Sequence, residues 1–395
     1  MRTKKSLSVE CMVCVCALLL AACGGDTTGG SGIRPGIGGS GSGGGGGGNG
    51  GAVAAGSSLA LFAGDNTASA GSNDGTGTAA RFSAPTGIAT DIQGNVFVAD
   101  SANETIREIT PSVAGGIVTT LSGVAGETGS TDTLIAAPHF FNPGGVATDT
   151  VGNLYVADSL NGTIRKIVVG SGVVTTLAGT AGTFGNTDDT GGAATFEFPL
   201  GVGTDSAHNV YVADFSNNNI RKVTPAGVVS TLAGPAGDVN VNVTGTTDAN
   251  GTSARFDGPS GVAVDSTGNV FVADTGNNTI RKITPAGDVT TFAGSALAAG
   301  SSDGTGTAAR FLNPRGLAID SLGNLYVADS GNGTIRKITP TGVVTTIAGV
   351  AGQQGFQMGT LPGRLNAPVG VAVSGTSLYV VISILNCVVV LANRP

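Results

Sequence analysis

A motif that recurs at a nearly constant spacing constrains the fold more than any other feature of this sequence. In its clearest copy, Gly-Asn-Val-Phe-Val-Ala-Asp begins at Gly268 and is followed by a short Asn-rich turn and Ile-Arg-Lys-Ile. Near-copies begin at Gly94, Gly152, His208 and Gly323. The valines of the Val-Ala-Asp triplets follow one another in nearly equal steps, at Val98, Val156, Val212, Val272 and Val327. Such a period indicates a repeat architecture.

A second marker, Pro-x-Gly followed by an aliphatic residue, gives the number of units. It occurs six times, at Pro85, Pro143, Pro199, Pro259, Pro314 and Pro368. In the fourth unit, runs of Val, Ile, Thr and Phe bounded by Gly, Asn and Pro predict four short strands over 261–265, 270–274, 279–284 and 289–293. Helical periodicity is missing, so we predict an all-β fold. The apolar residues do not alternate cleanly, which is typical of sheets that are covered on both faces.

The two ends of the repeat region distinguish a closed ring from an open stack. The sixth unit supplies strands over 369–373, 378–382 and 387–391, and its fourth strand is missing. Residues 58–64, Ser-Leu-Ala-Leu-Phe-Ala-Gly, match the fourth-strand pattern that ends at Gly294. We therefore predict a six-bladed β-propeller with four antiparallel strands per blade, closed by the N-terminal strand joining the last blade.

The repeated segment, Gly-Asn-Val-Phe-Val-Ala-Asp with Ile-Arg-Lys-Ile-Thr after it, resembles the NHL repeat, and the resemblance covers about 85% of the chain. The last unit departs from the pattern, with Ile382 in place of Asp and Val389 in place of Arg. Amidating lyases that share the resemblance hold zinc with several histidines, whereas this chain has two, His139 and His208. RNA-binding NHL domains use a strongly basic face, and this chain has a formal net charge of −7. We therefore expect no nucleic-acid partner.

The segment in front of the repeats predicts export and anchoring. Arg2, Lys4 and Lys5 precede an apolar run over 11–22, and Leu-Ala-Ala then leads to Cys23, which resembles the lipobox of bacterial lipoproteins. We expect a signal peptide over 1–22, a lipid on Cys23, a Gly- and Ser-rich flexible linker over 23–57 and a propeller over 58–395. The expected address is the bacterial cell envelope, with the outer membrane favoured, on its periplasmic side or surface. An ordinary cleavage site in front of a Cys is the alternative.

Removal of residues 1–22 takes away three basic residues and one acidic residue, and changes the net charge from −7 to −9. An acidic body without a basic run disfavours adhesion to anionic lipid. With Cys23 acylated, only Cys387 remains of the five cysteines, so neither a disulfide nor a Cys-based metal site is expected. Cys387 lies in an apolar run and is expected to be a buried apolar side chain.

Asp and Arg recur as a pair at one fixed spacing in the first five units. If Asp100 lies opposite Thr105 in a hairpin, then Val98 lies opposite Arg107, and Arg107 reaches Asp100 diagonally. We interpret the pairs as ion pairs that hold the loop between the second and third strands; a ring of acids that binds a cation or substrate is the alternative. The pairs are Asp100/Arg107, Asp158/Arg165, Asp214/Arg221, Asp274/Arg281 and Asp329/Arg336.

A second set of acids follows the innermost strand of the first five units, shortly before Gly-Asn or His-Asn. Asp at the start of such a turn commonly accepts hydrogen bonds from the backbone two residues ahead. The alternative is a calcium ion in the central channel, but such a site needs converging and non-identical ligands. The set is Asp91, Asp149, Asp205, Asp265 and Asp320.

Loops between units vary most, and we expect a ligand first on the rim that carries them, over 124–141, 180–197, 235–256, 295–311 and 350–364. The segment Ser72–Phe82 recurs almost unchanged at 301–311, and neither copy has the Gly-Lys-Ser/Thr of a phosphate-binding loop.

The sequence thus predicts a membrane-anchored binding scaffold for a protein, peptide or glycan of the envelope. We expect no catalytic, cofactor or metal residue. A metal-dependent propeller enzyme of the lactonase or lyase type, with a site in the channel, and a purely structural envelope component are the alternatives.

Overall fold

The computed structural model describes residues 57–133, 137–237, 243–296, 298–353 and 355–394. Ala52–Pro395 is one compact unit, distinct from Met1–Gly51. The expected signal peptide, the lipid site at Cys23 and the linker up to residue 56 lie outside the described residues. Within the described part of the chain, no helix is long and apolar enough to cross a membrane.

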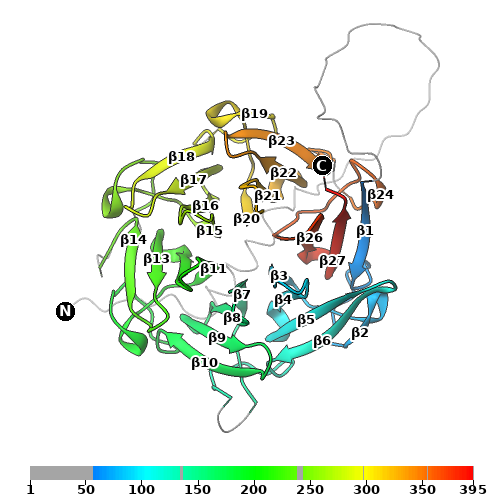
Figure 1. The fold of residues 1–395 in the computed structure, drawn as a ribbon, viewed down its shortest axis with the longest axis horizontal. Coiled ribbons are helices and arrows are strands. Elements are labelled where there is room, and N and C mark those ends of the chain that lie inside the picture. The colour runs from blue at the N-terminus through cyan, green and yellow to red at the C-terminus, as the bar shows by residue number, and fades with distance from the viewer. Residues whose placement is uncertain (1–56, 134–136, 238–242, 297, 354, 395) are drawn as a thin grey trace, which may run out of the picture. The chain divides into compact units, whose positions relative to one another are not determined.

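Six antiparallel sheets surround a central axis, as Figure 1 shows, so the predicted all-β six-bladed propeller is confirmed. Each blade has four main strands, written here from the axis outward. Blade 1 contains β3 (Pro85–Thr90), β4 (Val96–Asp100), β5 (Thr105–Ser112) and β6 (Gly115–Ser122). Blade 2 contains β7 (Pro143–Thr148), β8 (Asn153–Asp158), β9 (Thr163–Val168) and β10 (Val173–Ala178). Blade 3 contains β11 (Pro199–Thr204), β12 (Val210–Asp214), β13 (Asn219–Val223) and β14 (Val229–Ala233).

The remaining blades follow the same order. Blade 4 contains β15 (Pro259–Val264), β16 (Val270–Asp274), β17 (Thr279–Ile283) and β18 (Val289–Gly294). Blade 5 contains β20 (Pro314–Ile319), β21 (Leu325–Asp329), β22 (Thr334–Ile338) and β23 (Val343–Ala348). Blade 6 contains β25 (Gly370–Ser374), β26 (Ser377–Ile382), β27 (Cys387–Ala392) and β1 (Ser58–Ala63).

Blade 6 is completed by the first strand of the described chain. β1 pairs antiparallel with β27, and Ser58 lies opposite Ala392. The Ser57 hydroxyl also donates to the Asn393 carbonyl at 2.5 Å. The prediction that the N-terminal strand closes the ring is therefore confirmed.

Three blades carry a fifth, very short strand at the outer edge, which the sequence analysis did not predict. These strands are β2 (Gly75–Thr76), β19 (Gly304–Thr305) and β24 (Gly359–Thr360). In blade 1, Thr76 pairs with Ile117 of β6, so part of the inter-blade loop lies along the outermost strand. A strand that consists of Gly-Thr alone has too little sequence pattern to be recognised.

The only helical segments in the described ranges are single 3₁₀ turns. They are η1 (Gly77–Ala79), η2 (Ser101–Asn103), η3 (Gly191–Ala193), η4 (Phe215–Asn217), η5 (Gly251–Ser253), η6 (Gly306–Ala308), η7 (Ser330–Asn332) and η8 (Ser383–Leu385).

The strand order gives the ring two different faces. The loop face carries the loops between the second and third strands, such as 101–104, and the starts of the innermost strands, such as Pro85. The turn face carries the turns between the first and second strands, such as 91–95, and between the third and fourth, such as 113–114. The two kinds of turn lie side by side. In blade 2 the amide of Val169, between the third and fourth strands, donates to the carbonyl of Gly152, between the first and second. Since Ser57 contacts Asn393, just beyond the turn-face end of β27, the described chain begins on the turn face.

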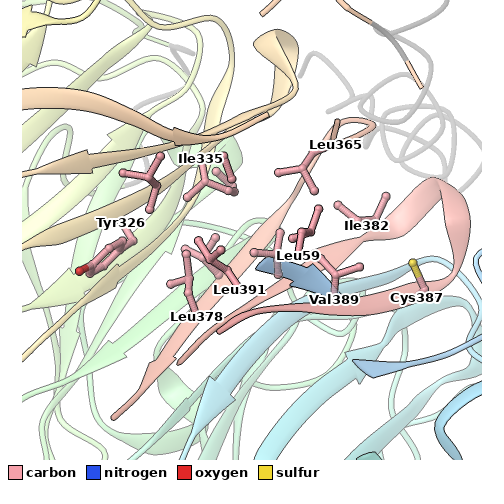
Figure 2. Packing of buried hydrophobic residues seen from close by; sticks show 14 residues of the cluster. Leu59, Tyr326, Ile335, Leu365, Leu378, Ile382, Cys387, Val389 and Leu391 are labelled. Carbon is pink, nitrogen blue, oxygen red and sulfur yellow. The ribbon is translucent and has the colours of Figure 1, made fainter. Parts of the chain in front are cut away.

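The apolar core lies between blades rather than in one central cluster. The second strand of each blade is buried along its whole length or nearly so, because both of its faces pack against neighbouring blades. This arrangement explains why the sequence lacks clean alternation. In blade 6 the cluster of Figure 2 places Ile382, Val389 and Leu365 together. Cys387 is fully buried beside them, as predicted.

Candidate functional site

The repeated Asp and Arg residues form buried ion pairs in five blades. In blade 1, Arg107 donates through Nη1 to Asp100 Oδ2 at 2.8 Å and through Nη2 to Asp74 Oδ1 at 2.7 Å. The side chains of Asp100 and Arg107 are fully buried, whereas that of Asp74 is 49% exposed. The ion-pair interpretation is therefore confirmed. The equivalent triplets are Asp158–Arg165–Asp132, Asp214–Arg221–Asp188, Asp274–Arg281–Asp248 and Asp329–Arg336–Asp303.

Each triplet also fixes the loop that arrives from the preceding blade. Asp100 accepts from the Ser83 amide and from Asn103 Nδ2, and Arg107 donates to the Arg81 carbonyl. Burial raises the pKa of Asp100 to about 6, against the lowering effects of these donors and of the Arg107 charge. The bases of the inter-blade loops are thus anchored in the same way in five blades, and they belong to the framework.

Two members of this network were not predicted from the sequence. One is the outer acid, Asp74 and its equivalents, which precedes the Arg by the same number of positions in each of the five blades. The other is a Phe at a second fixed spacing before the Arg, and its ring centroid lies 5.1–5.3 Å from the guanidinium carbon. Both spacings are constant, so the alignment of the repeats contained the signal. These phenylalanines are Phe82, Phe140, Phe196, Phe256 and Phe311.

Side chains at the ends of the loop-face loops link neighbouring blades. Asn278 Oδ1 accepts from the Asn313 amide, and Asn386 Oδ1 accepts from the Ala84 amide. In blade 1 a carboxylate replaces the amide, and Glu104 Oε2 accepts from the Asn142 amide. Burial raises the pKa of Glu104 to about 7, and the nearby Asp158 charge adds to the shift.

The second set of acids lies on the turn face, inside its own turns. Asp149 accepts from the amides of Val151 and Asn153 and from the Tyr155 hydroxyl. Burial acts to raise the pKa of Asp149, but these hydrogen bonds outweigh it and the net pKa is lowered. The balance is the same at Asp205, Asp265 and Asp320. The predicted hydrogen bonds to backbone two residues ahead are confirmed for all five members, Asp91 included.

The two histidines lie on opposite faces of the ring, His139 on the loop face and His208 on the turn face. His139 Nδ1 lies 2.6 Å from Thr131 Oγ1, and its Nε2 lies 3.1 Å from Glu127 Oε2, in the loop that leads to blade 2. His208 lies in a turn of blade 3 at φ 61°, where other blades have Gly, and its Nδ1 is 3.4 Å from Asp149 Oδ2. Among the described residues, no three His, Cys, Asp or Glu side chains form a group that could hold a metal ion.

Around the central channel, one glycine in the innermost strand of each blade lies directly against the backbone of the next blade. A Cβ added to Gly201 would lie 1.9 Å from the Ser260 carbonyl oxygen, and one added to Gly261 would lie 2.1 Å from that of Arg315. The backbones of adjacent blades therefore contact each other at these positions, which explains why the Gly of the Pro-x-Gly marker recurs six times. These glycines are Gly87, Gly145, Gly201, Gly261, Gly316 and Gly370.

The residue before each of these glycines surrounds the loop-face end of the channel, and no two of the six are alike. We call them the channel-mouth residues; they line a cavity of about 120 Å³ together with the glycines and an aliphatic ring below. Arg315 is the only charged residue in this lining. The channel-mouth residues are Thr86, Gly144, Leu200, Ser260, Arg315 and Val369.

The two channel-mouth residues that carry a hydroxyl group form hydrogen bonds with hydroxyl groups of the loops between the second and third strands. Thr86 Oγ1 lies 2.6 Å from Ser101 Oγ, and Ser260 Oγ lies 2.6 Å from Thr275 Oγ1. Beside Leu200, blade 3 has Phe215 where other blades have Ser or Thr, and its ring packs edge-on against Phe198 with centroids 6.0 Å apart. The mouth therefore combines polar, cationic and apolar walls in one ring.

Comparisons with known proteins agree with this geometry. Residues 256–283 and 311–338 match the NHL repeat, so the chain carries NHL repeats, as its sequence predicted. It is similar to NHL repeat-containing protein 2 of Homo sapiens, with 34% identity over 160 residues, 37% of this chain and 22% of that protein. The chain spans about a fifth of the length of the curated relatives it matches.

Two solved structures share the propeller fold along most of the chain. A structural genomics protein of unknown function from Bacteroides thetaiotaomicron has a TM-score of 0.65 and 22% identity, over 85% of this chain and 76% of that one. An auxiliary nutrient binding protein of the same organism has a TM-score of 0.62 and 14% identity, over 86% of this chain and 77% of that one. At these identities the likeness establishes the fold.

Proposed function

Because the chain is a six-bladed propeller that carries NHL repeats, we propose that it is a non-enzymatic binding scaffold of the bacterial cell envelope. The observation that carries the proposal is the ring of channel-mouth residues. The framework repeats almost unchanged around the ring, whereas these six positions differ in charge, size and polarity. A rigid frame that displays unlike side chains around a cavity is the usual form of a binding site on such a fold.

The partner is a protein, peptide or glycan of the envelope, bound at the channel mouth and the surrounding loop face. Leu200 and Phe215, which packs on the buried Phe198, are half-buried and offer apolar contact, and the mouth also presents Ser260 and Arg315 for polar recognition. The auxiliary nutrient binding protein with this fold is a precedent for a binding role.

The proposed membrane anchor is compatible with the side of the ring on which the chain enters the propeller. The proposed anchor, a lipid on Cys23 after removal of residues 1–22, precedes the described chain, which begins on the turn face at Ser57. The loop face is the opposite face of the ring. A partner bound at the channel mouth therefore does not compete with the point at which the anchor is attached.

The lactonase or lyase alternative requires acids, histidines or a metal at the channel. The described lining of the channel instead consists of glycines, aliphatic residues, two hydroxyls and Arg315. Both acid sets are engaged elsewhere, in buried ion pairs and in their own turns. The geometry therefore favours binding over catalysis.

The test is a thermal-shift screen of Ala52–Pro395, the compact unit that closes its own ring. Envelope peptides and oligosaccharides, including peptidoglycan fragments, are added one at a time. A bound ligand raises Tm by several degrees when its concentration is far above Kd. The variant Leu200→Asp should lose the shift, and Val113→Ser on the turn face should keep it.

Mass spectrometry of the recovered ligand completes the test. An unchanged ligand agrees with a scaffold, whereas a cleaved or eliminated product would refute the non-enzymatic part of the proposal. A shift that survives Leu200→Asp, or the failure of every peptide and glycan to shift Tm, would refute binding at the channel mouth.

A further inference from the structure

Exposed apolar side chains are concentrated on the turn face. The four most exposed large apolar residues of the described chain are Ile92, Val113, Val151 and Leu322, at 74%, 110%, 67% and 77%. The next most exposed, Val228, is 44% exposed. All four lie in turns of the turn face: three follow innermost strands, and Val113 lies between β5 and β6. The distribution is therefore one-sided.

The carboxylates that begin three of these turns, those of Asp91, Asp149 and Asp320, accept hydrogen bonds from within the turns themselves. Asp91 accepts from the amides of Gln93 and Asn95, and Asp149 accepts from those of Val151 and Asn153. The carboxylates are therefore folded back, and the aliphatic side chains of Ile92 and Val151 form the tips. The apolar tips can therefore be buried against another surface without breaking these hydrogen bonds.

The loop face differs in composition. Its loops consist mainly of Gly, Ser, Thr, Asn and Asp, and the most exposed large apolar residues of the inter-blade loops, Met358 and Phe184, are only 40% and 39% exposed. A further difference is the chain direction, since the described chain begins at Ser57 and enters the propeller on the turn face. The face with apolar tips is thus the face to which an anchored chain is tied.

We propose that the turn face rests on a lipid bilayer, with the tips at Ile92, Val113, Val151 and Leu322 inserted among the headgroups. This inference rests on the membrane attachment proposed above and adds a second, direct contact to it. Because the chain is acidic, the contact is apolar and suits zwitterionic lipid rather than an anionic surface. The aliphatic tips add apolar contact with the bilayer to that of the lipid on Cys23.

The experiment uses the full chain, processed in a bacterial host and reconstituted into vesicles of phosphatidylethanolamine and phosphatidylcholine that carry nitroxide lipids. A fluorophore is placed by Ile92→Cys on the turn face or by Ala102→Cys on the loop face of the same blade. The native Cys387 is fully buried and does not compete for the label. We expect quenching at position 92, little at position 102, and no change when salt is raised, because the contact is not ionic.

A second variant tests whether the other tips cause the contact. Adding Val151→Ser and Leu322→Ser to Ile92→Cys should reduce the quenching at least about twofold, because two apolar insertions are lost. Both side chains are exposed, so the fold is retained, and circular dichroism checks this.

The outcomes separate this inference from the proposed function. A chain that floats with the vesicles but shows equal quenching at positions 92 and 102, or none at 92, refutes the lipid contact alone. A chain that does not float with the vesicles refutes the membrane attachment itself. A fluorescence change at position 92 that needs no lipid and grows with protein concentration assigns the turn face to a second copy of the chain instead.

Discussion

Blade 6 suggests a test of what the buried ion pairs contribute to the other blades. In blade 4, Arg281 is 1% exposed, donates to Asp274 at 2.8 Å and to the Arg255 carbonyl at 2.9 Å, and packs on Phe256. In blade 6 the equivalent positions hold Val389, Ile382 and Leu365, and Phe356 packs against the same apolar cluster. Blade 6 therefore has the same strand architecture as the other blades, with an apolar cluster in place of the buried ion pair.

The perturbation is a double-mutant cycle in blade 4. Arg281→Val leaves the Asp274 carboxylate and the Arg255 carbonyl buried without their partner, and we expect a loss of about 5 kcal/mol. Asp274→Ile leaves Arg281 with one carboxylate, that of Asp248, and we expect a loss of about 3 kcal/mol. The double variant removes both buried charges and copies blade 6, so it should lose only about 2 kcal/mol, less than either single change.

Urea unfolding of Ala52–Pro395 followed by circular dichroism measures these differences, since the chain has no Trp for fluorescence. Lys282→Ala, at the neighbouring half-buried position, is the control and should cost less than about 1 kcal/mol. If the double variant loses as much as the two single variants together, the charges do not act as a coupled pair, and the reasoning is wrong.

Three further changes test the ring, its charge and its closure. Gly201→Ala should destabilise by at least about 3 kcal/mol because its Cβ meets backbone of the next blade, whereas Gly170→Ala, with open space, should be neutral in urea unfolding. Glu104→Gln should raise the free energy of unfolding by about 2 kcal/mol above pH 7, a figure reduced to allow for screening by solvent near the surface. Below pH 4.5 the substitution should leave the free energy of unfolding unchanged. The sign follows because burial raises the folded pKa of Glu104 to about 7, so stability falls as pH rises from 4.5 to 7; a pH-independent difference in Tm would contradict it. A chain that begins at residue 65 lacks β1 and should aggregate in size-exclusion chromatography, whereas one that begins at residue 52 should remain monomeric.

The framework was predictable because it repeats. Val98 opposite Arg107, the pairing of Asp100 with Arg107 and the closing strand at 58–64 all follow from the period and from strand geometry, and the structure confirms each. Asp74 and Phe82 were missed although their spacing from Arg107 is constant, because they lie in loops whose lengths and compositions vary between blades.

The candidate site was less predictable. The channel-mouth residues stand beside the recurring Gly, but their place around one cavity depends on the tilt of six strands, which no single repeat encodes. The sequence analysis predicted a ligand on the rim that carries the inter-blade loops. In the structure the bases of these loops are held by the repeated ion pairs and belong to the framework. The exposed tips at Ile92 and Leu322 carry no motif, and their common face emerges only when the blades are assembled.

The pairing of β1 with β27 also determines the order in which this chain is completed during synthesis and export. Blades 1 to 5 each draw their four main strands from one continuous stretch, so each folds soon after it emerges from the ribosome or translocon. β1 is the first strand to emerge, and its partner β27 is the last. Since the contact between Ser57 and Asn393 joins residues 336 positions apart, β1 remains unpaired until synthesis is nearly finished. During that interval the chain exposes the open edge of an incomplete ring, which is the stage at which we expect it to depend most on chaperones.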